Sequence, residues 1–355
     1  MILLALKNQY ICANKIIDRM KTTLSEIAKR TGYSLTTISR VLNGKSVDYR
    51  ISQEATDLIV AEARRCNYII KSNAQILRQN NTKIIGVLLP SVTNPFFAEL
   101  AGTIVSEVRQ RGYTAIIAVT DENEADQEAC LSSLMTRNVE GVIAAPCGCN
   151  PNLFYSINRD MAPVVLIDRF FMDSNISYIS SNNFNGAVDA TRFLIGNGHR
   201  NIVCIQGDID SVPNSRRVEG YKKAMTDAGL EEMISVVGDS FSEQNGYFET
   251  KLILGDPSKH PSAIFALSYT IALGVMKALR EGNLEIGKDI SLISFDDNMS
   301  LGYMHPPITR VAQPTSEMGR FAVKVLFEQI ENPQAAITRI ELNTKIINGN
   351  SVAGI

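Results

Sequence analysis

Several residues with the chemistry of a ligand site stand directly after apolar runs that are typical of buried strands. Asp168 and Asp296 each end such a run, Arg169 follows the first of them, and Phe96 and Phe97 follow a third run. A carboxylate accepts hydrogen bonds from two neighbouring hydroxyls, an arginine holds an anion or a ring oxygen, and an aromatic ring covers the C–H face of a sugar. As a set these residues indicate a carbohydrate-like ligand. Each phenylalanine alone is equally consistent with core packing.

The elements that must position these residues follow one another in a regular order. Apolar runs of strand length alternate with amphipathic patterns of helical period from residue 84 onward. The predicted strands span 84–89, 114–119, 141–145, 164–168, 178–181, 201–207, 234–238, 263–267 and 291–296, and the predicted helices span 95–111, 124–137, 184–197, 215–228, 243–254, 269–281 and 316–330. Such alternation predicts parallel sheets covered by helices, with the ligand crevice outside the carboxyl ends of the strands.

A second group of polar residues lies near the beginning of the chain, on one face of a short predicted helix. Ser34 caps this helix, and Ile38, Val41 and Leu42 form its apolar stripe. The opposite face carries small polar groups and one guanidinium, from Thr36, Ser39, Arg40 and Asn43. This arrangement predicts a buried face and a face that is free to meet a partner.

Two further helices complete this head. Thr23-Leu24-Ser25-Glu26 reads as a capping box that begins the first helix, and Gly32 supplies the turn after it. A third helix is predicted from Ser52 to about Arg65. Two short helices joined by a glycine turn, the second with an exposed polar face, are typical of a helix-turn-helix that reads DNA in the major groove.

Charge is distributed unevenly along the chain. Residues 20–80 carry ten Lys or Arg and five acids, a net charge of +5, whereas residues 81–355 hold −9. A basic head on an acidic body indicates that only the head meets a polyanion. An ordinary solvent-exposed helical face would give the same composition, so the helix-turn-helix motif decides in favour of DNA binding.

Composition and motifs exclude several classes of protein. With 355 residues, 45% hydrophobic and 20% charged, the chain suits two or three globular domains, and no apolar run approaches the ~20 residues of a membrane span. The six cysteines form no CxxC pair, and Cys147-Gly148-Cys149 is interpreted as a loop, so reduced thiols are expected. The three histidines show no metal-ligand spacing, and dinucleotide, P-loop and esterase motifs are absent. Neither a metal, a cofactor nor a catalytic residue is predicted.

Residues 1–21 are interpreted as a leader. The apolar start ends at Lys7, with no preceding basic region and no following cleavage site, which argues against a signal peptide. Met20 stands just before the first predicted helix and is a candidate for the true start.

The head contains a long and specific string, composed of Gly32-Tyr33-Ser34, Thr37-Ile38-Ser39-Arg40-Val41-Leu42-Asn43-Gly44 and Asn67-Tyr68. This string closely resembles the DNA-binding head of the lactose/galactose repressor family. The resemblance implies that Leu35 and Thr36 reach base edges in the major groove and that Arg40 reads a guanine. It leaves phosphate and register contacts to Ser34, Ser39 and Asn43.

The segment after the head resembles the family's hinge. Ser72 to Arg78 matches the hinge helix, which enters the minor groove as a pair, and Leu77 matches the leucine that opens a base step. The family usually has proline where this chain has Ile70, which predicts a looser entry to the hinge. The alternative for Leu77 is an ordinary apolar linker residue.

The resemblance continues over residues 22 to about 350, through pieces such as Asn94-Pro95-Phe96-Phe97, Val164 to Arg169, and Phe295-Asp296-Asp297. It implies an α/β fold class, with two Rossmann-like lobes of periplasmic-binding-protein type preceded by a small all-α helix-turn-helix domain. The implied divisions are a DNA-binding domain at 22–68, a hinge at 69–81 and an effector-binding and dimerisation domain at 82–355, whose first lobe takes about 82–181 and 312–335 and whose second takes about 182–311 and 336–355.

The resemblance also implies contacts with the ligand. Arg217 matches the family's ligand-contacting arginine in an Arg-x-x-Gly-Tyr element, and Phe241 falls where relatives often place an aromatic ring. The family usually has a hydroxyl-binding acid where this chain has Tyr269. With Arg169, Arg216 and Arg217 expected nearby, this departure suggests an anionic effector, such as a sugar acid or a sugar phosphate.

Together these features predict a sequence-specific transcriptional repressor in the bacterial cytoplasm, associated with the nucleoid. No leucine heptads that could form a tetramerising coiled coil follow the last strand, so a homodimer is expected. This homodimer is expected to bind a pseudo-palindromic operator and to be controlled allosterically by a sugar-like effector. A solute-binding receptor without a DNA role is the alternative, and it would require export. An enzyme is a third class, which no nucleophile–base pair supports.

Overall fold

The computed structural model describes residues 24–355 except 43, 67, 69–81, 173 and 256–259. The chain divides into two compact units, Met1–Arg78 and Gln79–Ile355. The predicted DNA contacts at Asn43 and Leu77, and the start of the capping box at Thr23, lie outside the described residues.

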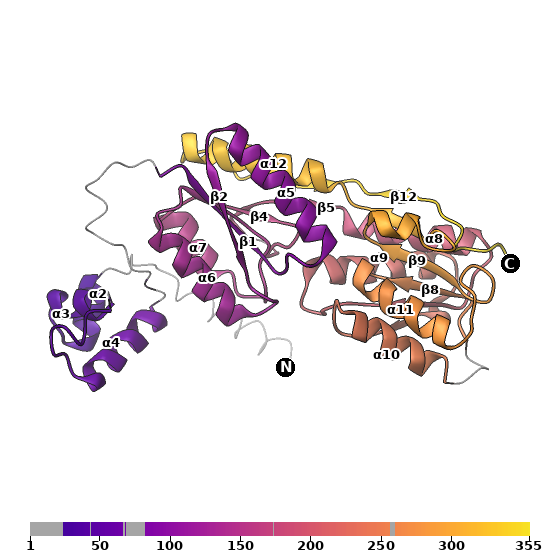
Figure 1. Cartoon of the computed structure of the whole chain (residues 1–355), viewed down its shortest axis with the longest axis horizontal. Helices are drawn as coiled ribbons and strands as arrows, with labels where there is room; N and C mark the ends of the chain where they lie inside the picture. Colours follow the sequence, from indigo (N-terminus) through magenta and orange to yellow (C-terminus); the bar gives the residue numbers. More distant parts are fainter. Residues whose placement is uncertain (1–23, 43, 67, 69–81, 173, 256–259) are drawn as a thin grey trace, which may run out of the picture. The chain divides into compact units, whose positions relative to one another are not determined.

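The described part of the first unit contains three helices, which confirms the predicted head (Figure 1). They are α2 (Leu24–Thr31), α3 (Leu35–Leu42) and α4 (Gln53–Arg65). Ser34 caps α3, because its Oγ accepts a hydrogen bond from the backbone N–H of Thr37 at 3.1 Å. The apolar stripes of the three helices meet in a small core of Ile27, Ile38, Val41, Ile59 and Ala63. This core fixes which face of α3 turns to solvent.

Two six-stranded sheets run through the described part of the second unit. The first consists of β1 (Ile84–Leu89), β2 (Thr114–Val119), β3 (Gly141–Ala144), β4 (Val164–Ile167), β5 (Ser177–Ser181) and β11 (Arg339–Leu342). The second consists of β6 (Ile202–Ile205), β7 (Ser235–Val237), β8 (Ala263–Ala266), β9 (Ser291–Phe295), β10 (Thr309–Ala312) and β12 (Lys345–Ile347).

The two sheets repeat one topology. Their strand orders are β11-β5-β4-β3-β1-β2 and β12-β10-β9-β8-β6-β7, so β4 and β9 occupy corresponding central places. All pairs are parallel except β10 with β12, which is antiparallel. The chain passes between the sheets after β5, after β10, and between β11 and β12. The predicted two-lobed α/β fold class is confirmed.

Helices cover both faces of each sheet (Figure 1). They are α5 (Pro95–Gln110), α6 (Glu124–Thr136), α7 (Asn152–Asp160), α8 (Asn183–Gly196), α9 (Val212–Asp227), α10 (Glu243–Ile253), α11 (Tyr269–Glu281) and α12 (Thr315–Glu331), with short 3-10 turns at η1 (Glu231–Met233) and η3 (Met299–Gly302). In the first lobe α5 and α12 share one core with the sheet, and in the second lobe α8 with α9 and α10 with α11 form cores on opposite faces.

Two parts of the predicted organisation are corrected by this topology. The segment 336–355 does not belong wholly to the second lobe, because β11 pairs with β5 in the first sheet. The reason is that α12 packs on the first sheet and only a short connection separates it from β11. Helix α7 was not predicted. It is only nine residues long, and Phe154 and Ile157 are its buried side chains, which leaves a weak periodic signal.

Candidate ligand cleft and DNA-reading face

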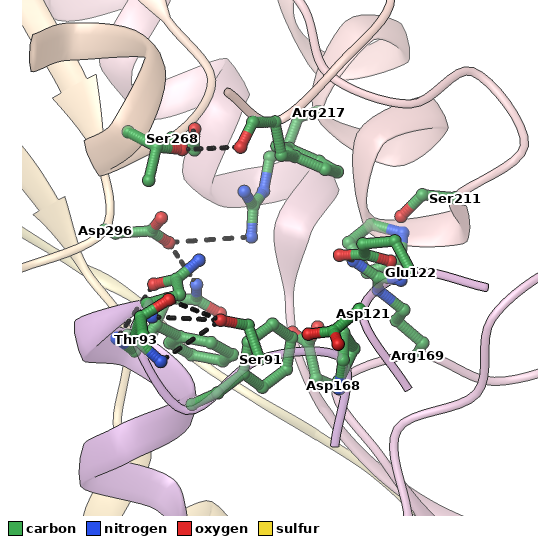
Figure 2. A pocket seen from close by; sticks show the side chains of 18 residues that line it. Ser91, Thr93, Asp121, Glu122, Asp168, Arg169, Ser211, Arg217, Ser268 and Asp296 are labelled. Carbon is green, nitrogen blue, oxygen red and sulfur yellow. Dashed lines mark hydrogen bonds and ion pairs between the residues drawn. The ribbon is translucent and has the colours of Figure 1, made fainter. Parts of the chain in front are cut away.

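A cavity of about 340 Å³ opens where the carboxyl ends of strands from both sheets face each other (Figure 2). The first lobe contributes residues after β1, β2 and β4, and the second lobe contributes residues after β6, β7, β8, β9 and β10. The lining consists of Pro90, Ser91, Thr93, Asn94, Phe96, Phe97, Asp121, Glu122, Asp168, Arg169, Ser211, Pro213, Arg217, Phe241, Ser268, Thr270, Asp296 and Gln313. This set of residues is called the cleft below.

Asp168 and Asp296 hold equivalent positions in the two lobes. Asp168 directly follows β4 and Asp296 directly follows β9, and each is only 5% exposed. Both have left-handed backbone angles, with φ of 63° and 75°. Glycine would adopt this conformation at lower cost, but it would supply no carboxylate. Backbone angles of this kind, which cost free energy, often occur at binding sites.

Arg217 is fixed in the cleft from several sides. Its Nε donates to Asn183 Oδ1 at 2.8 Å, and one terminal nitrogen donates to the carbonyl of Leu267 at 2.7 Å. The guanidinium lies over the ring of Phe295, 3.8 Å from its centroid, and its other terminal nitrogen is 3.9 Å from Asp296 Oδ1. Burial lowers the pKa of Arg217. Figure 2 shows this side chain directed toward Asp296.

Asp296 is oriented by groups from two other elements. Gln313, in the crossover after β10, donates to Oδ1 of Asp296 at 2.6 Å. The backbone N–H of Tyr269, at the start of α11, donates to Oδ2 at 3.2 Å. The carboxylate is therefore held in one orientation with part of its hydrogen-bonding capacity available to the cavity.

Asp168 has an unusual environment. Its burial raises the pKa of the carboxyl to about 6, although Arg217 and Arg169 oppose the rise. Asp296 and Glu122 add to the rise by charge repulsion. Its Oδ1 is buried and has no hydrogen-bond partner.

Unsatisfied polar atoms gather in the cleft. Among the described residues, five buried side-chain oxygens have no hydrogen-bond partner, and three of them line this cavity: Asp168 Oδ1, Ser211 Oγ and Gln313 Oε1. A buried polar atom without a partner costs about 1–3 kcal/mol. Their concentration at one cavity points to a polar ligand that supplies the missing hydrogen bonds.

The lining of the cleft contains more acidic than basic side chains. It contains four carboxylates, from Asp121, Glu122, Asp168 and Asp296, and two arginines. Arg169 already forms a bidentate pair with Glu122, with one N–O distance of 2.7 Å. This balance weighs against the anionic effector suggested by the sequence. Arg216, which contributed to that suggestion, does not line the cavity and pairs with Glu219.

The structure brings together most of the predicted ligand residues. Phe96, Phe97, Asp168, Arg217, Phe241 and Asp296 all line the cleft. Tyr269 does not line it: the Tyr269 hydroxyl shares a hydrogen bond with Ser300 at 3.1 Å, while the neighbouring Ser268 and Thr270 face the cavity. The lining of the cleft therefore gives no support to a contact between the phenol of Tyr269 and a ligand, and that contact stays a prediction.

Sequence reasoning did not identify several polar residues of the cleft. These are Ser91, Thr93, Asn94, Asp121, Glu122, Ser211, Ser268, Thr270 and Gln313. Most of them follow a strand closely, so the rule that ligands bind at strand carboxyl ends could have found them if applied to every strand. Gln313 lies in a crossover, where no strand pattern had been predicted.

A second recess adjoins the cleft. It has a volume of about 290 Å³ and shares Arg169 and Ser211 with the cleft. Cys149 lies on its wall, in the loop after β3, and the thiol of Cys147 in the same loop is hydrogen-bonded to Thr120 at 3.0 Å. Neither cysteine forms a disulfide with another described residue.

The DNA-reading face predicted on α3 is exposed. Leu35 is 50% exposed, Thr36 and Arg40 are also exposed, and Ser39 is half-buried. The guanidinium of Arg40 lies over the ring of Tyr49, a residue that the sequence did not single out. Small polar groups, one apolar side chain and one guanidinium therefore lie together on one helix face.

Metal sites and membrane spans are both absent from the part of the chain that the structure describes. No group of three or more His, Cys, Asp or Glu side chains there could hold a metal ion. None of the described helices has the length and apolar character needed to cross a membrane.

Comparison of the sequence with known proteins gives two family matches. Residues 23–70 match the bacterial regulatory proteins of the lacI family, and residues 191–352 match a periplasmic binding protein-like domain. The chain is 31% identical over 332 residues to the ribose operon repressor of Escherichia coli strain K12, covering 93% of this chain and 99% of that protein. It is 30% identical over 335 residues to the HTH-type transcriptional repressor PurR of Vibrio campbellii, covering 93% and 98%.

Solved structures agree with these matches. A complex of the transcriptional regulator CelR with cellobiose superposes with a TM-score of 0.71 at 25% identity, covering 93% of this chain and 99% of that one. A LacI family transcriptional regulator from Enterococcus faecium with bound ribose gives a TM-score of 0.68 at 26% identity, covering 77% and 99%. The family resemblance predicted from the sequence is confirmed, and the chain belongs to the lacI family of bacterial regulatory proteins.

Proposed function

We propose that this chain is a transcriptional repressor that binds operator DNA through α3 and whose affinity for DNA is controlled by a neutral sugar bound in the cleft. The observation that carries the ligand half of the proposal is the set of three buried oxygens without hydrogen-bond partners that line the cleft, at Asp168, Ser211 and Gln313. Sugar hydroxyls both donate and accept hydrogen bonds and so can pair with all three, and Phe96, Phe97 and Phe241 offer rings for the C–H faces.

The size and charge of the cleft favour a small neutral sugar, and we take D-ribose as the first candidate. A volume of about 340 Å³ is near the lower end of the range for small-molecule sites, ~300–1,000 Å³. A phosphate or carboxylate would meet Asp121, Asp168 and Asp296, while Arg169 is already neutralised by Glu122. The ribose-bound relative and the ribose operon repressor support the same choice.

The DNA half of the proposal rests on the exposed face of α3. Leu35 and Thr36 would contact base edges, Arg40 would take guanine O6 and N7, and Ser34 and Ser39 would contact phosphates. Asn43 and Leu77, outside the described residues, are proposed for a phosphate contact and for the minor-groove wedge of a hinge at 69–81. Two heads in a homodimer would read the two halves of a pseudo-palindrome.

Effector and operator would be coupled through the relative position of the two lobes. The ligand would contact Asp168 in the first lobe and Arg217 and Asp296 in the second, so binding would favour one arrangement of the lobes over another. Such coupling is reciprocal: if the ligand lowers the affinity of the protein for DNA, then bound DNA lowers the affinity for the ligand by the same factor. The domain boundaries 22–68, 69–81 and 82–355, and a place of action on nucleoid DNA in the cytoplasm, follow from the same proposal.

The test combines two titrations. The full chain is used to select an operator from randomised duplexes, and fluorescence anisotropy then measures its affinity for that operator with and without D-ribose, with D-ribose 5-phosphate as a charged comparison. We expect selective DNA binding that D-ribose alters and D-ribose 5-phosphate does not.

The matched variants are Arg40→Ala, which should lose selectivity, and Asp296→Asn, which should lose only the response to ribose. A chain that selects no operator would overturn the proposal, and a response to the phosphate alone would overturn the neutral ligand.

The alternative of a solute-binding receptor without a DNA role is less well supported. The folded helix-turn-helix head and its capped, solvent-facing α3 have no part in such a function. The operator selection described above separates the two functions directly.

A further inference from the structure

The loop between α3 and α4 is folded against the end of α3. The backbone N–H of Lys45 donates to the carbonyl of Arg40 at 2.9 Å, and that of Ile51 donates to Ser46 at 2.9 Å. Tyr49 and Arg50 donate to Lys45 and Val47 at 3.3 and 3.1 Å. These bonds give the loop a defined path, so that the position of Tyr49 relative to α3 is set by the backbone.

This path brings the Tyr49 ring against the Arg40 side chain. The guanidinium carbon of Arg40 is 3.8 Å from the centroid of the Tyr49 ring. Tyr49 is 49% exposed, so it contributes little to the core of the head, whose buried members come from the three helices. A half-exposed aromatic ring that covers one face of a guanidinium is better explained by a role at the surface than by a role in the core.

A stack of this kind holds an arginine without consuming its hydrogen bonds. The guanidinium is planar, and its N–H donors point outward in its own plane, away from the ring that it covers. The edge that would meet guanine O6 and N7 therefore stays available. A long, exposed side chain otherwise loses much of its rotational freedom when it binds, and holding it beforehand reduces that cost.

We propose that Tyr49 is a positioning residue for DNA reading, which holds the Arg40 guanidinium ready for its base. The proposal rests on the proposed function only in that Arg40 reads a base edge. Stacks of this kind at exposed sites are worth enough to change an affinity by about two- to fivefold. Loss of the ring should therefore weaken specific binding by that factor and leave binding to random DNA nearly unchanged.

The experiment uses the full chain, the operator that the wild type selects, and a random duplex of equal length. Tyr49→Leu and Tyr49→Gln remove the ring, and Tyr49→Phe keeps it and is the matched control. Each change is also made in the Arg40→Ala background, which completes a double-mutant cycle. Circular dichroism and thermal unfolding show whether each variant is folded.

We expect Tyr49→Leu and Tyr49→Gln to lose about two- to fivefold in operator affinity per head and to discriminate less at the base pair that Arg40 reads. Tyr49→Phe should stay within about twofold of the wild type. In the Arg40→Ala background the ring deletions should have no further effect. If they cost the same in both backgrounds, or nothing in either, the positioning role is overturned while the proposed function stands. A wild-type chain with no preference for any duplex would instead overturn the proposed function.

Discussion

Binding of ribose in the cleft should be linked to the proton of Asp168. Burial raises the pKa of this carboxyl to about 6, with Arg217 and Arg169 opposing the rise and Asp296 and Glu122 adding to it. Its Oδ1 lacks a hydrogen-bond donor, and the side chain is already almost completely buried. A sugar hydroxyl that donates to this oxygen favours the charged form and adds little further burial, so binding should lower the pKa.

The size of the pH dependence follows from the pKa of Asp168 in the free protein and its pKa in the complex. If binding returns the pKa from about 6 to its ordinary value of 3.8, ribose prefers the ionised carboxylate. The affinity should then be about tenfold higher at pH 7 than at pH 5, and nearly constant above pH 7. At pH 6, where half of the free protein carries the proton, binding should release about half a proton per site.

Isothermal titration calorimetry with D-ribose measures both the affinity at each pH and the number of protons released on binding. Titrations at pH 5, 6 and 7 give the affinity ratio, and repeating the pH 6 titration in two buffers of different ionisation enthalpy gives the number of protons released. Asp168→Asn is the matched control, because it keeps the shape of the side chain and cannot titrate. Its affinity for ribose should be lower than that of the wild type at pH 7 and should change little between pH 5 and pH 7.

An affinity that is flat from pH 5 to pH 7 in the wild type would refute this reasoning. Proton uptake in place of release would refute it as well, because it would mean that the ligand buries the carboxyl without supplying a hydrogen bond. If the affinity for ribose still changed with pH in Asp168→Asn, the proton linkage would belong to another titratable group.

Three further outcomes are expected. Arg40→Ala should cost ~1–3 kcal/mol on the selected operator and relax the preference at one base pair, as measured by anisotropy on single-base variants; an equal loss on random DNA would reassign Arg40 to a phosphate. Gly207→Val should weaken ribose binding in calorimetry, because a Cβ at Gly207 would lie 2.4 Å from the Phe241 ring and push it toward the cavity, whereas unchanged affinity would remove Phe241 from the site. Phe265→Ala should reduce the free energy of unfolding by ~3–5 kcal/mol in urea titrations, since Phe265 is fully buried in the core of the second lobe.

The sequence predicted those parts of the site that depend on local pattern. Asp168 and Asp296 were identified because each ends an apolar run, and the carboxyl ends of parallel strands meet at one edge of a sheet. The exposed face of α3 was identified for a similar reason, since Ile38 and Val41 fix the buried face by helical spacing alone. Arg217 and Phe241 came from the family resemblance, which records where a shared fold brings distant residues together.

Other features depended on contacts that no local pattern records. Tyr269 was expected to contact the ligand, yet its hydroxyl is hydrogen-bonded to Ser300, and Ser268 and Thr270 line the cavity instead. The backbone at Ser268 is extended, and an extended backbone sends successive side chains to opposite sides. Gln313 became a cleft residue only because the crossover after β10 passes beside Asp296.

By itself, therefore, the sequence determined the alternating α/β body, the basic helix-turn-helix head and the strand-end carboxylates, because hydrophobic period and capping chemistry act over a few residues. Only the tertiary structure decided that Glu122 neutralises Arg169, that Arg40 lies on the ring of Tyr49, and that β11 joins the first sheet. Each of these is a contact between segments that are separated along the chain. Its existence depends on how elements pack, so the same residues with another packing would leave Arg169 free for an anion and Arg40 without its support.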